Sequence, residues 1–146
     1  MINFWQIIVL VHVFSMLSWL GAMYFNLVLL FPMYRSRAGN GYAELMQAQG
    51  TRAAPLLYAL IFLTMVSGTA LALHQGINLN STSFMLKMGT WVGMLAMHLY
   101  GSFVIWPRVF FALDSEKGAL FFRYKISMLI SATLGSCAVI FSYLTK

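Results

Sequence analysis

The sequence predicts an all-α integral membrane protein, a bundle of four transmembrane helices in one domain over residues 1–146. Three observations support this prediction. Hydrophobic residues make up 61% of the 146 residues and charged residues only 8%, whereas a soluble domain carries about 25% charged residues. Four apolar runs are long enough to cross a hydrocarbon core of ~30 Å as helices. The basic residues gather in two of the three connecting loops, which is typical of membrane topology.

The four helices are expected at about residues 4–32, 54–74, 84–113 and 119–144. The first apolar run is too long for the core of a signal peptide and has no basic start, since its first charged residue is Arg35. It is therefore expected to stay as a transmembrane helix. Pro32 lies at its exit, where a helix can kink or stop.

Capping and turn signals give the other boundaries. Pro55 suits the first turn of the second helix, and Ser83 is a plausible N-cap of the third. The run Asp114–Gly118 is expected to form a turn before the fourth helix. Small and slightly polar residues suited to close helix contact recur in the second and fourth helices. They are Thr64, Ser67, Gly68, Ser127, Ser131, Gly135, Ser136 and Ala138.

The net charge of +6 is best interpreted as topology charge, with the lipid bilayer and not a nucleic acid as the partner. The basic loop residues are Arg35, Arg37, Arg52, Arg108, Lys117, Arg123 and Lys125. They place the first and third loops in the cytoplasm and both termini on the outer, periplasmic side of a bacterial inner membrane. The single cysteine, Cys137, excludes an internal disulfide.

Polar residues inside the expected helices form two stripes. In the first helix, steps of three and four place one set on a single face. That set is His12, Ser15, Trp19, Ala22 and Asn26. In the third helix, Lys87 and His98 are separated by ~1100° of helical rotation and share a face within ~20°, together with Trp91, Met94 and Gly101. An ionisable residue facing lipid costs ~2.5–3 kcal/mol or more, so both stripes should face a bundle interior, a cavity or a cofactor.

One haem between the first and third helices could take axial ligands from both stripes. His12 is the best single candidate, as a neutral imidazole in apolar surroundings. The second ligand is left open: depth favours Lys87 slightly, and ligand chemistry favours His98. Trp19, Trp91 and Tyr100 could line the porphyrin.

Simpler explanations compete with each of these assignments. His12 and His98 could make only interhelical hydrogen bonds, and Lys87 could extend to the membrane surface. The 11 methionines suit Cu(I) but are better explained as core packing. No phosphate-binding loop, paired carboxylates or cysteine-based zinc pattern is present, and the acids Glu44, Asp114 and Glu116 lie in expected loops.

Two motifs resemble known membrane families. His12 followed by Trp19-Leu20-Gly21 and a Phe31-Pro32 exit resembles the opening of the CopD-like copper-resistance proteins. Lys87 followed by His98-Leu99-Tyr100 resembles a stretch of HemJ, the small bacterial protoporphyrinogen oxidase family. The chain departs from the HemJ pattern at Met85, where a histidine is usual, and has TMVSG where the second helix usually carries a Pro-Gly step.

The HemJ resemblance implies a haem b-binding redox protein that uses His12 and Lys87, and that oxidises a tetrapyrrole or passes electrons to quinone. If the chain is an enzyme, it is an oxidoreductase of protoporphyrinogen oxidase type. The CopD resemblance implies copper binding or transport at the outer face, with His12, His74 and nearby methionines. A third hypothesis is a cofactor-free accessory subunit of a larger membrane complex. Since 146 residues leave little room to enclose a porphyrin, a homo-oligomer or a larger complex is expected.

Overall fold

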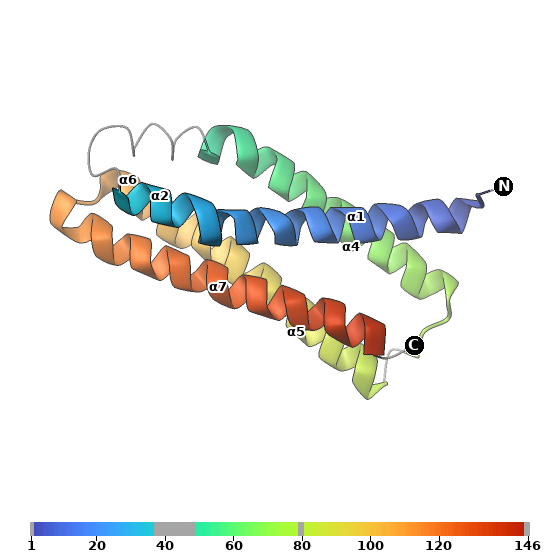
Figure 1. Ribbon diagram of the computed structural model, residues 1–146. Coiled ribbons are helices and arrows are strands. Elements are labelled where there is room, and N and C mark those ends of the chain that lie inside the picture. Colours follow the sequence, from blue (N-terminus) through green and yellow to red (C-terminus); the bar gives the residue numbers. More distant parts are fainter. Residues whose placement is uncertain (1, 37–48, 79–80, 145–146) are drawn as a thin grey trace. The chain divides into compact units, whose positions relative to one another are not determined.

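The computed structural model describes residues 2–36, 49–78 and 81–144, which are helical with short connections and contain no strand (Figure 1). The chain divides into two compact units, Met1–Ile77 and Asn78–Lys146. Within the described residues, four helical stretches are long and apolar enough to cross a membrane. They are Phe4–Met33, Gly50–His74, Thr82–Val109 and Ser115–Tyr143. The predicted all-α class is thus confirmed for the described residues, together with four helices that are long and apolar enough to cross a membrane.

The first unit begins with α1 (Phe4–Phe25), which continues through a π-helical segment η1 (Asn26–Leu30) into α2 (Phe31–Ser36). A capping box starts α1: Gln6 N donates to Asn3 Oδ1 over 2.8 Å, and Asn3 N donates to Gln6 Oε1 over 2.9 Å. This reciprocal pair satisfies two amide groups that the first turn leaves without helical partners.

The second helix of this unit, α4 (Ala54–His74), follows a π-helical segment η2 (Gln49–Ala53) and packs along α1 (Figure 1). Gly76 ends it with a φ of 57°, a left-handed conformation that only glycine adopts without strain. The α1–α4 pair is the framework of the first unit.

The second unit consists of α5 (Thr82–Leu99), the π-helical segment η3 (Tyr100–Ile105), α6 (Trp106–Phe111) and α7 (Asp114–Leu144). The α5, η3 and α6 segments follow one another along α7, and all three contact it (Figure 1). The small residues predicted for close packing on α7 are buried or half-buried, as expected.

All three prolines lie two residues after a π-helical segment: Pro32 after η1, Pro55 after η2 and Pro107 after η3. Proline lacks an N–H and its ring clashes with the carbonyl four residues back in an α-helix. The wider turn uses a carbonyl five residues back, as where Phe31 N donates to Asn26 O. The first helix therefore continues beyond Pro32, although the sequence marks this proline as its exit.

Two predicted boundaries are wrong. The N-cap of α5 is Ser81, whose hydroxyl accepts from the backbone N–H three residues on, and not Ser83. The run Asp114–Gly118 is the first turn of α7 and not a free turn. The Glu116 carboxylate accepts from the Leu113 N–H over 3.3 Å, which is one half of a capping box. An acidic residue in a first turn also suits the helix dipole, a signal that favours a helix start here.

Charged residues mark where each helix can leave the hydrocarbon. In the second unit, the uncharged stretch between Lys87 and Arg108 is about 20 residues long, and α7 carries no charge after Lys125. In the first unit, about 21 uncharged residues separate Arg52 from His74. At 1.5 Å per residue, each of these stretches matches a core of ~30 Å. They give a depth scale for each unit taken alone.

Candidate functional site

His12 is anchored on α4 through one ring nitrogen. Its Nδ1 lies 3.1 Å from the Thr64 carbonyl oxygen and 3.1 Å from Ser67 Oγ. A carbonyl can only accept a hydrogen bond, so Nδ1 carries the proton and donates it. In the neutral ring the lone pair then belongs to Nε2. The helix packing thus selects the imidazole tautomer that binds a metal through Nε2.

Hydroxyl groups surround this anchor. Thr64 Oγ1 donates to Ser15 Oγ over 2.9 Å and shares its proton with the Leu60 carbonyl over 2.8 Å. Ser15 Oγ in turn donates to the His12 carbonyl over 3.1 Å, and Ser67 Oγ donates to a carbonyl of its own helix. Ser15, Thr64 and Ser67 are all buried. Polar groups in an apolar bundle are costly without partners, and here the two helices supply them to each other.

Gly68 gives the imidazole its room. A Cβ atom added at Gly68 would lie 2.8 Å from His12 Cε1 and 3.3 Å from Nδ1. Carbon atoms in contact are normally 3.5–4.0 Å apart, so only glycine allows the ring to lie here. We call His12, Ser15, Thr64, Ser67 and Gly68 the histidine cluster.

The histidine cluster lies near the middle of the membrane-spanning part of the first unit. Thr64, whose carbonyl accepts from His12, is about halfway between Arg52 and His74 on α4. On the depth scale above this is ~15 Å from either boundary. In a membrane that α4 crosses, this level is within the hydrocarbon, where a polar side chain needs a partner or a function.

The predicted stripe on α5 is confirmed as the inward-facing side of that helix. Met94 is fully buried, and its carbonyl accepts from Ser131 Oγ of α7 over 2.8 Å. Lys87, Trp91 and His98 are half-buried. Gly101 on the same stripe is also buried, and a Cβ added there would lie 2.7 Å from Ser127 Oγ.

Lys87 and His98 lie on the same face of α5 but at different positions along the helix axis. They are separated by ~16 Å along α5, so one iron or one small ligand cannot contact both. Lys87 is at the boundary of the uncharged stretch, and His98 is near its middle. On this scale His98 is the deeper of the two residues, whereas the sequence alone slightly favours Lys87 on depth.

The aromatic residues expected to line a porphyrin differ in exposure. Trp19 is fully buried and Trp91 is half-buried, so both are in dry or partly dry surroundings. Tyr100 is 46% exposed, so its own unit does not enclose it. Trp19 belongs to the unit that holds His12, and Trp91 to the unit that holds Lys87 and His98.

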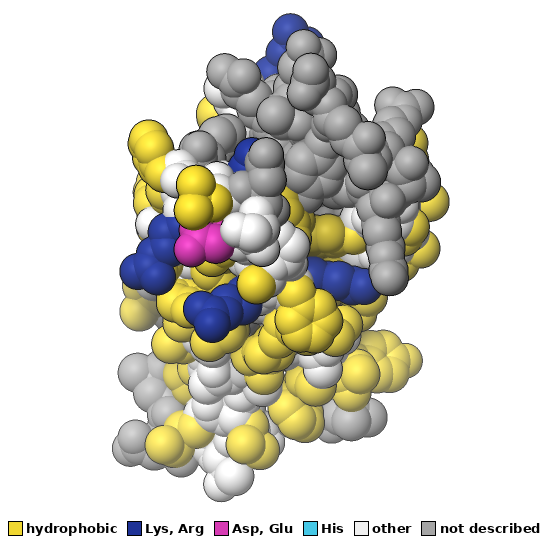
Figure 2. All heavy atoms as spheres, turned by 90° about the vertical axis from the view of Figure 1, so that its left-hand side faces the viewer, with side chains coloured by type: hydrophobic (Ala, Val, Ile, Leu, Met, Phe, Trp, Pro, Cys, Tyr) yellow, Lys and Arg dark blue, Asp and Glu magenta, His cyan; other side chains and the backbone are white. Residues whose placement is uncertain are grey.

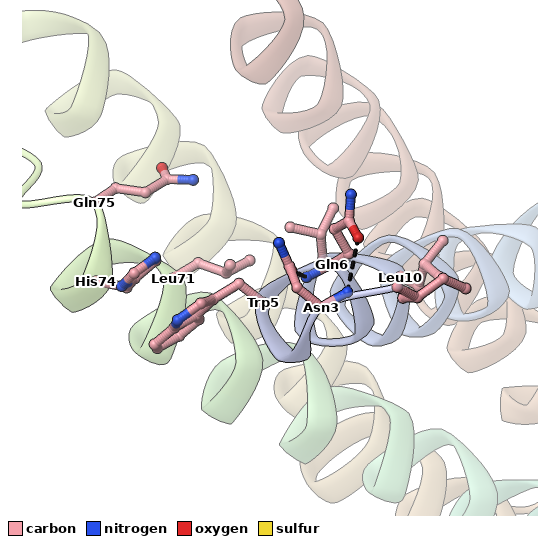
Figure 3. A pocket seen from close by; sticks show the side chains of 9 residues that line it. Asn3, Trp5, Gln6, Leu10, Leu71, His74 and Gln75 are labelled. Atoms are coloured by element: carbon pink, nitrogen blue, oxygen red, sulfur yellow. Dashed lines mark hydrogen bonds between the residues drawn. The ribbon is translucent and has the colours of Figure 1, made fainter.

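An open groove of about 580 Å³ lies at the other histidine of the first unit, His74 (Figure 3). The His74 ring stacks on the Trp5 indole with centroids 3.6 Å apart and planes 6° from parallel. The capping box occupies the amide oxygens of Asn3 and Gln6, so their amide NH2 groups are the groups left to donate at the rim. His12 does not line this groove.

Copper ligation by His12 and His74 together does not fit this geometry. His74 ends α4 about ten residues beyond Thr64, or ~15 Å along the helix from the His12 level. Among the described residues there is no group of three or more His, Cys, Asp or Glu side chains that could hold a metal ion. The packing interpretation of the methionines holds in part. Met16, Met23, Met94 and Met128 are buried, whereas Met33, Met65, Met85 and Met88 are exposed.

The sequence identified His12 and the small polar patch on the second helix separately, but not as partners. The signal was present, because a polar stripe and a small-residue patch inside a membrane both need a complementary face. No protein-family model, curated protein or solved structure matches this chain.

Proposed function

We propose that this chain is a haem b-binding redox protein of a bacterial inner membrane, with His12 as an axial ligand through Nε2. The observation that carries the proposal is the hydrogen bond from His12 Nδ1 to the Thr64 carbonyl. Metal-binding histidines in proteins almost always donate their second ring N–H to a carbonyl, carboxylate or water. That bond orients the ring and makes the ligating nitrogen more basic.

The second ligand stays open between Lys87 and His98. Within its own unit, His98 lies near the middle of the uncharged stretch between Lys87 and Arg108. Lys87 lies at a boundary, where its ammonium group can reach the lipid headgroups and could pair with a haem propionate. Imidazole is also the more usual haem ligand.

A bound haem would supply one-electron chemistry, and the protein would tune it through the axial ligands and the dryness of the pocket. The fully buried Trp19 is on the same face of α1 as His12 and is suited to keep water from the iron. The resemblance to the HemJ family supports a tetrapyrrole or a quinone as the redox partner. Protoporphyrinogen oxidase activity would be the corresponding enzymatic function.

The test is the reduced-minus-oxidised absorption spectrum of the purified protein. The spectrum of the wild-type protein is compared with the spectra of the variants His12→Asn and His12→Ala. The asparagine amide can still donate to the Thr64 carbonyl, but it has no nitrogen at the position of Nε2. We expect both variants to lose the α-band of haem b, while His12→Asn keeps most of the stability that His12→Ala loses. His74→Ala is the matched control, because it removes an exposed imidazole of the same unit. Haem retained in His12→Asn would refute axial ligation.

The second candidate is a cofactor-free subunit of a membrane complex, and the wild-type spectrum tests it. It is favoured by the histidine cluster, in which hydrogen bonds between α1 and α4 already satisfy polar groups of both helices. A colourless wild-type protein, purified with haem available, that co-purifies with other membrane proteins would support this candidate. Metal analysis of that preparation would test copper binding.

A further inference from the structure

The longest helix of the second unit extends beyond the hydrocarbon. α7 has 31 residues and is therefore ~46 Å long, whereas the core it crosses is ~30 Å thick. All its charged residues belong to the first dozen positions, and the run from Ile126 to Leu144 has none. About three turns at the start of α7 thus project past the hydrocarbon boundary.

The end of the preceding helix reaches the same level. Trp106 of α6 contacts Tyr124 of α7 with ring centroids 5.1 Å apart. Trp and Tyr are enriched at the membrane–water interface, where their polar edges meet the headgroups. Arg108 follows Trp106, and Arg123 and Lys125 flank Tyr124. The aromatic contact therefore brings three cations from two helices to one depth.

We call Arg108, Arg123 and Lys125 the basic tip. All three residues are exposed. Apolar side chains on the same segments are exposed too, with Phe111 91% and Phe122 64% accessible. Figure 2, which looks onto the end of the molecule where α6 and α7 meet, shows Lys and Arg side chains among hydrophobic ones. Cations mixed with exposed aromatic rings match the composition of a membrane interface.

We infer that the basic tip binds the headgroup phosphates of anionic phospholipids, with phosphatidylglycerol as the simplest representative. Guanidinium groups pair with phosphate oxygens through two parallel hydrogen bonds, and a lysine adds a point charge. Phe111 and Phe122 lie on the headgroup side of the boundary that Arg108 and Lys125 mark, where an aromatic ring suits the interfacial region of a bilayer. A soluble anion such as a nucleic acid would satisfy the cations but leave these rings in water, so a lipid accounts for both features.

The test uses spin-labelled phosphatidylglycerol and phosphatidylcholine in membranes that contain the purified full-length protein. A cation near an anionic headgroup strengthens association by about fivefold. We therefore expect the wild-type protein to prefer phosphatidylglycerol at least fivefold, and the triple variant Arg108→Gln/Arg123→Gln/Lys125→Gln to show no preference. The preference should also fall in 1 M salt, where the Debye length is about 3 Å.

The control is Arg52→Gln, which removes one exposed cation from the other unit and should lower the preference much less than the triple variant does. The variant Arg108→Lys/Arg123→Lys keeps the charge and should keep most of the preference. Association of phosphatidylcholine reports whether each variant is still folded in the membrane. An unchanged preference in the triple variant, or an equal loss in Arg52→Gln, overturns the inference. Since no readout depends on haem, the result stands apart from the proposed function.

Discussion

Replacing Gly68 by alanine should separate α1 from α4 at the histidine cluster. The new Cβ would lie 2.8 Å from His12 Cε1, about 1 Å closer than carbon atoms pack. Moving the ring away by that amount would stretch the 3.1 Å hydrogen bond from Nδ1 to the Thr64 carbonyl past its useful range. Overpacking typically costs ~1–3 kcal/mol, and an interhelical hydrogen bond in a membrane is worth about 0.6 kcal/mol. We expect a loss of about 2–3 kcal/mol in the free energy of unfolding.

The control for this prediction is Gly21→Ala on α1, where an added Cβ meets nothing within 4 Å. Both substitutions place alanine in a helix, so any gain in helix propensity, up to ~1 kcal/mol, cancels in the comparison. The measurement is reversible unfolding in mixed micelles, followed by circular dichroism over a denaturing-detergent titration. If Gly68→Ala is as stable as Gly21→Ala, the close approach of His12 to α4 is wrong.

Two further predictions concern the pairing of α5 and η3 with α7. Gly101→Ala should lower the free energy of unfolding by about 1–3 kcal/mol, because the added Cβ would lie 2.7 Å from a buried hydroxyl of α7. The control is Gly118→Ala, where an added Cβ meets nothing within 4 Å, and it should leave the free energy of unfolding unchanged in the same titration. Ser131→Ala removes an interhelical hydrogen bond of 2.8 Å and should cost about 0.6 kcal/mol. Ser142→Ala removes only a bond within α7, so an equal loss there would contradict the interhelical assignment.

Hydropathy was sufficient to predict the helices, but their ends depend on local chemistry. The run Asp114–Gly118 contains charge and glycine, which are typical of a turn, yet it begins α7 because Glu116 caps the N–H of Leu113. Pro32 is a residue that usually ends a helix, but the π-helical segment before it allows the helix to continue. In both places a hydrogen bond determines whether the residues are helical, and composition alone does not reveal such a bond.

The inward faces were predictable because their cause is general. A polar side chain facing lipid is costly, so His12, Ser15 and His98 had to turn towards protein. Which partner each one meets was not predictable, since small residues on any neighbouring helix would serve equally well. The contact between His12 and Thr64 depends on the register of α1 against α4, which Gly68 helps to set.

The two candidate roles of His12 make use of the same bond. Donation from Nδ1 to the Thr64 carbonyl offsets the cost of burying an imidazole, which is all that a structural role requires. That donation also leaves the lone pair on Nε2 and makes it more basic, which is what a haem ligand requires. Stability measurements that remove the whole side chain therefore cannot distinguish the roles. A substitution that keeps the donor and removes Nε2, such as His12→Asn, separates them, because loss of the haem spectrum without loss of stability is expected only if Nε2 is a ligand.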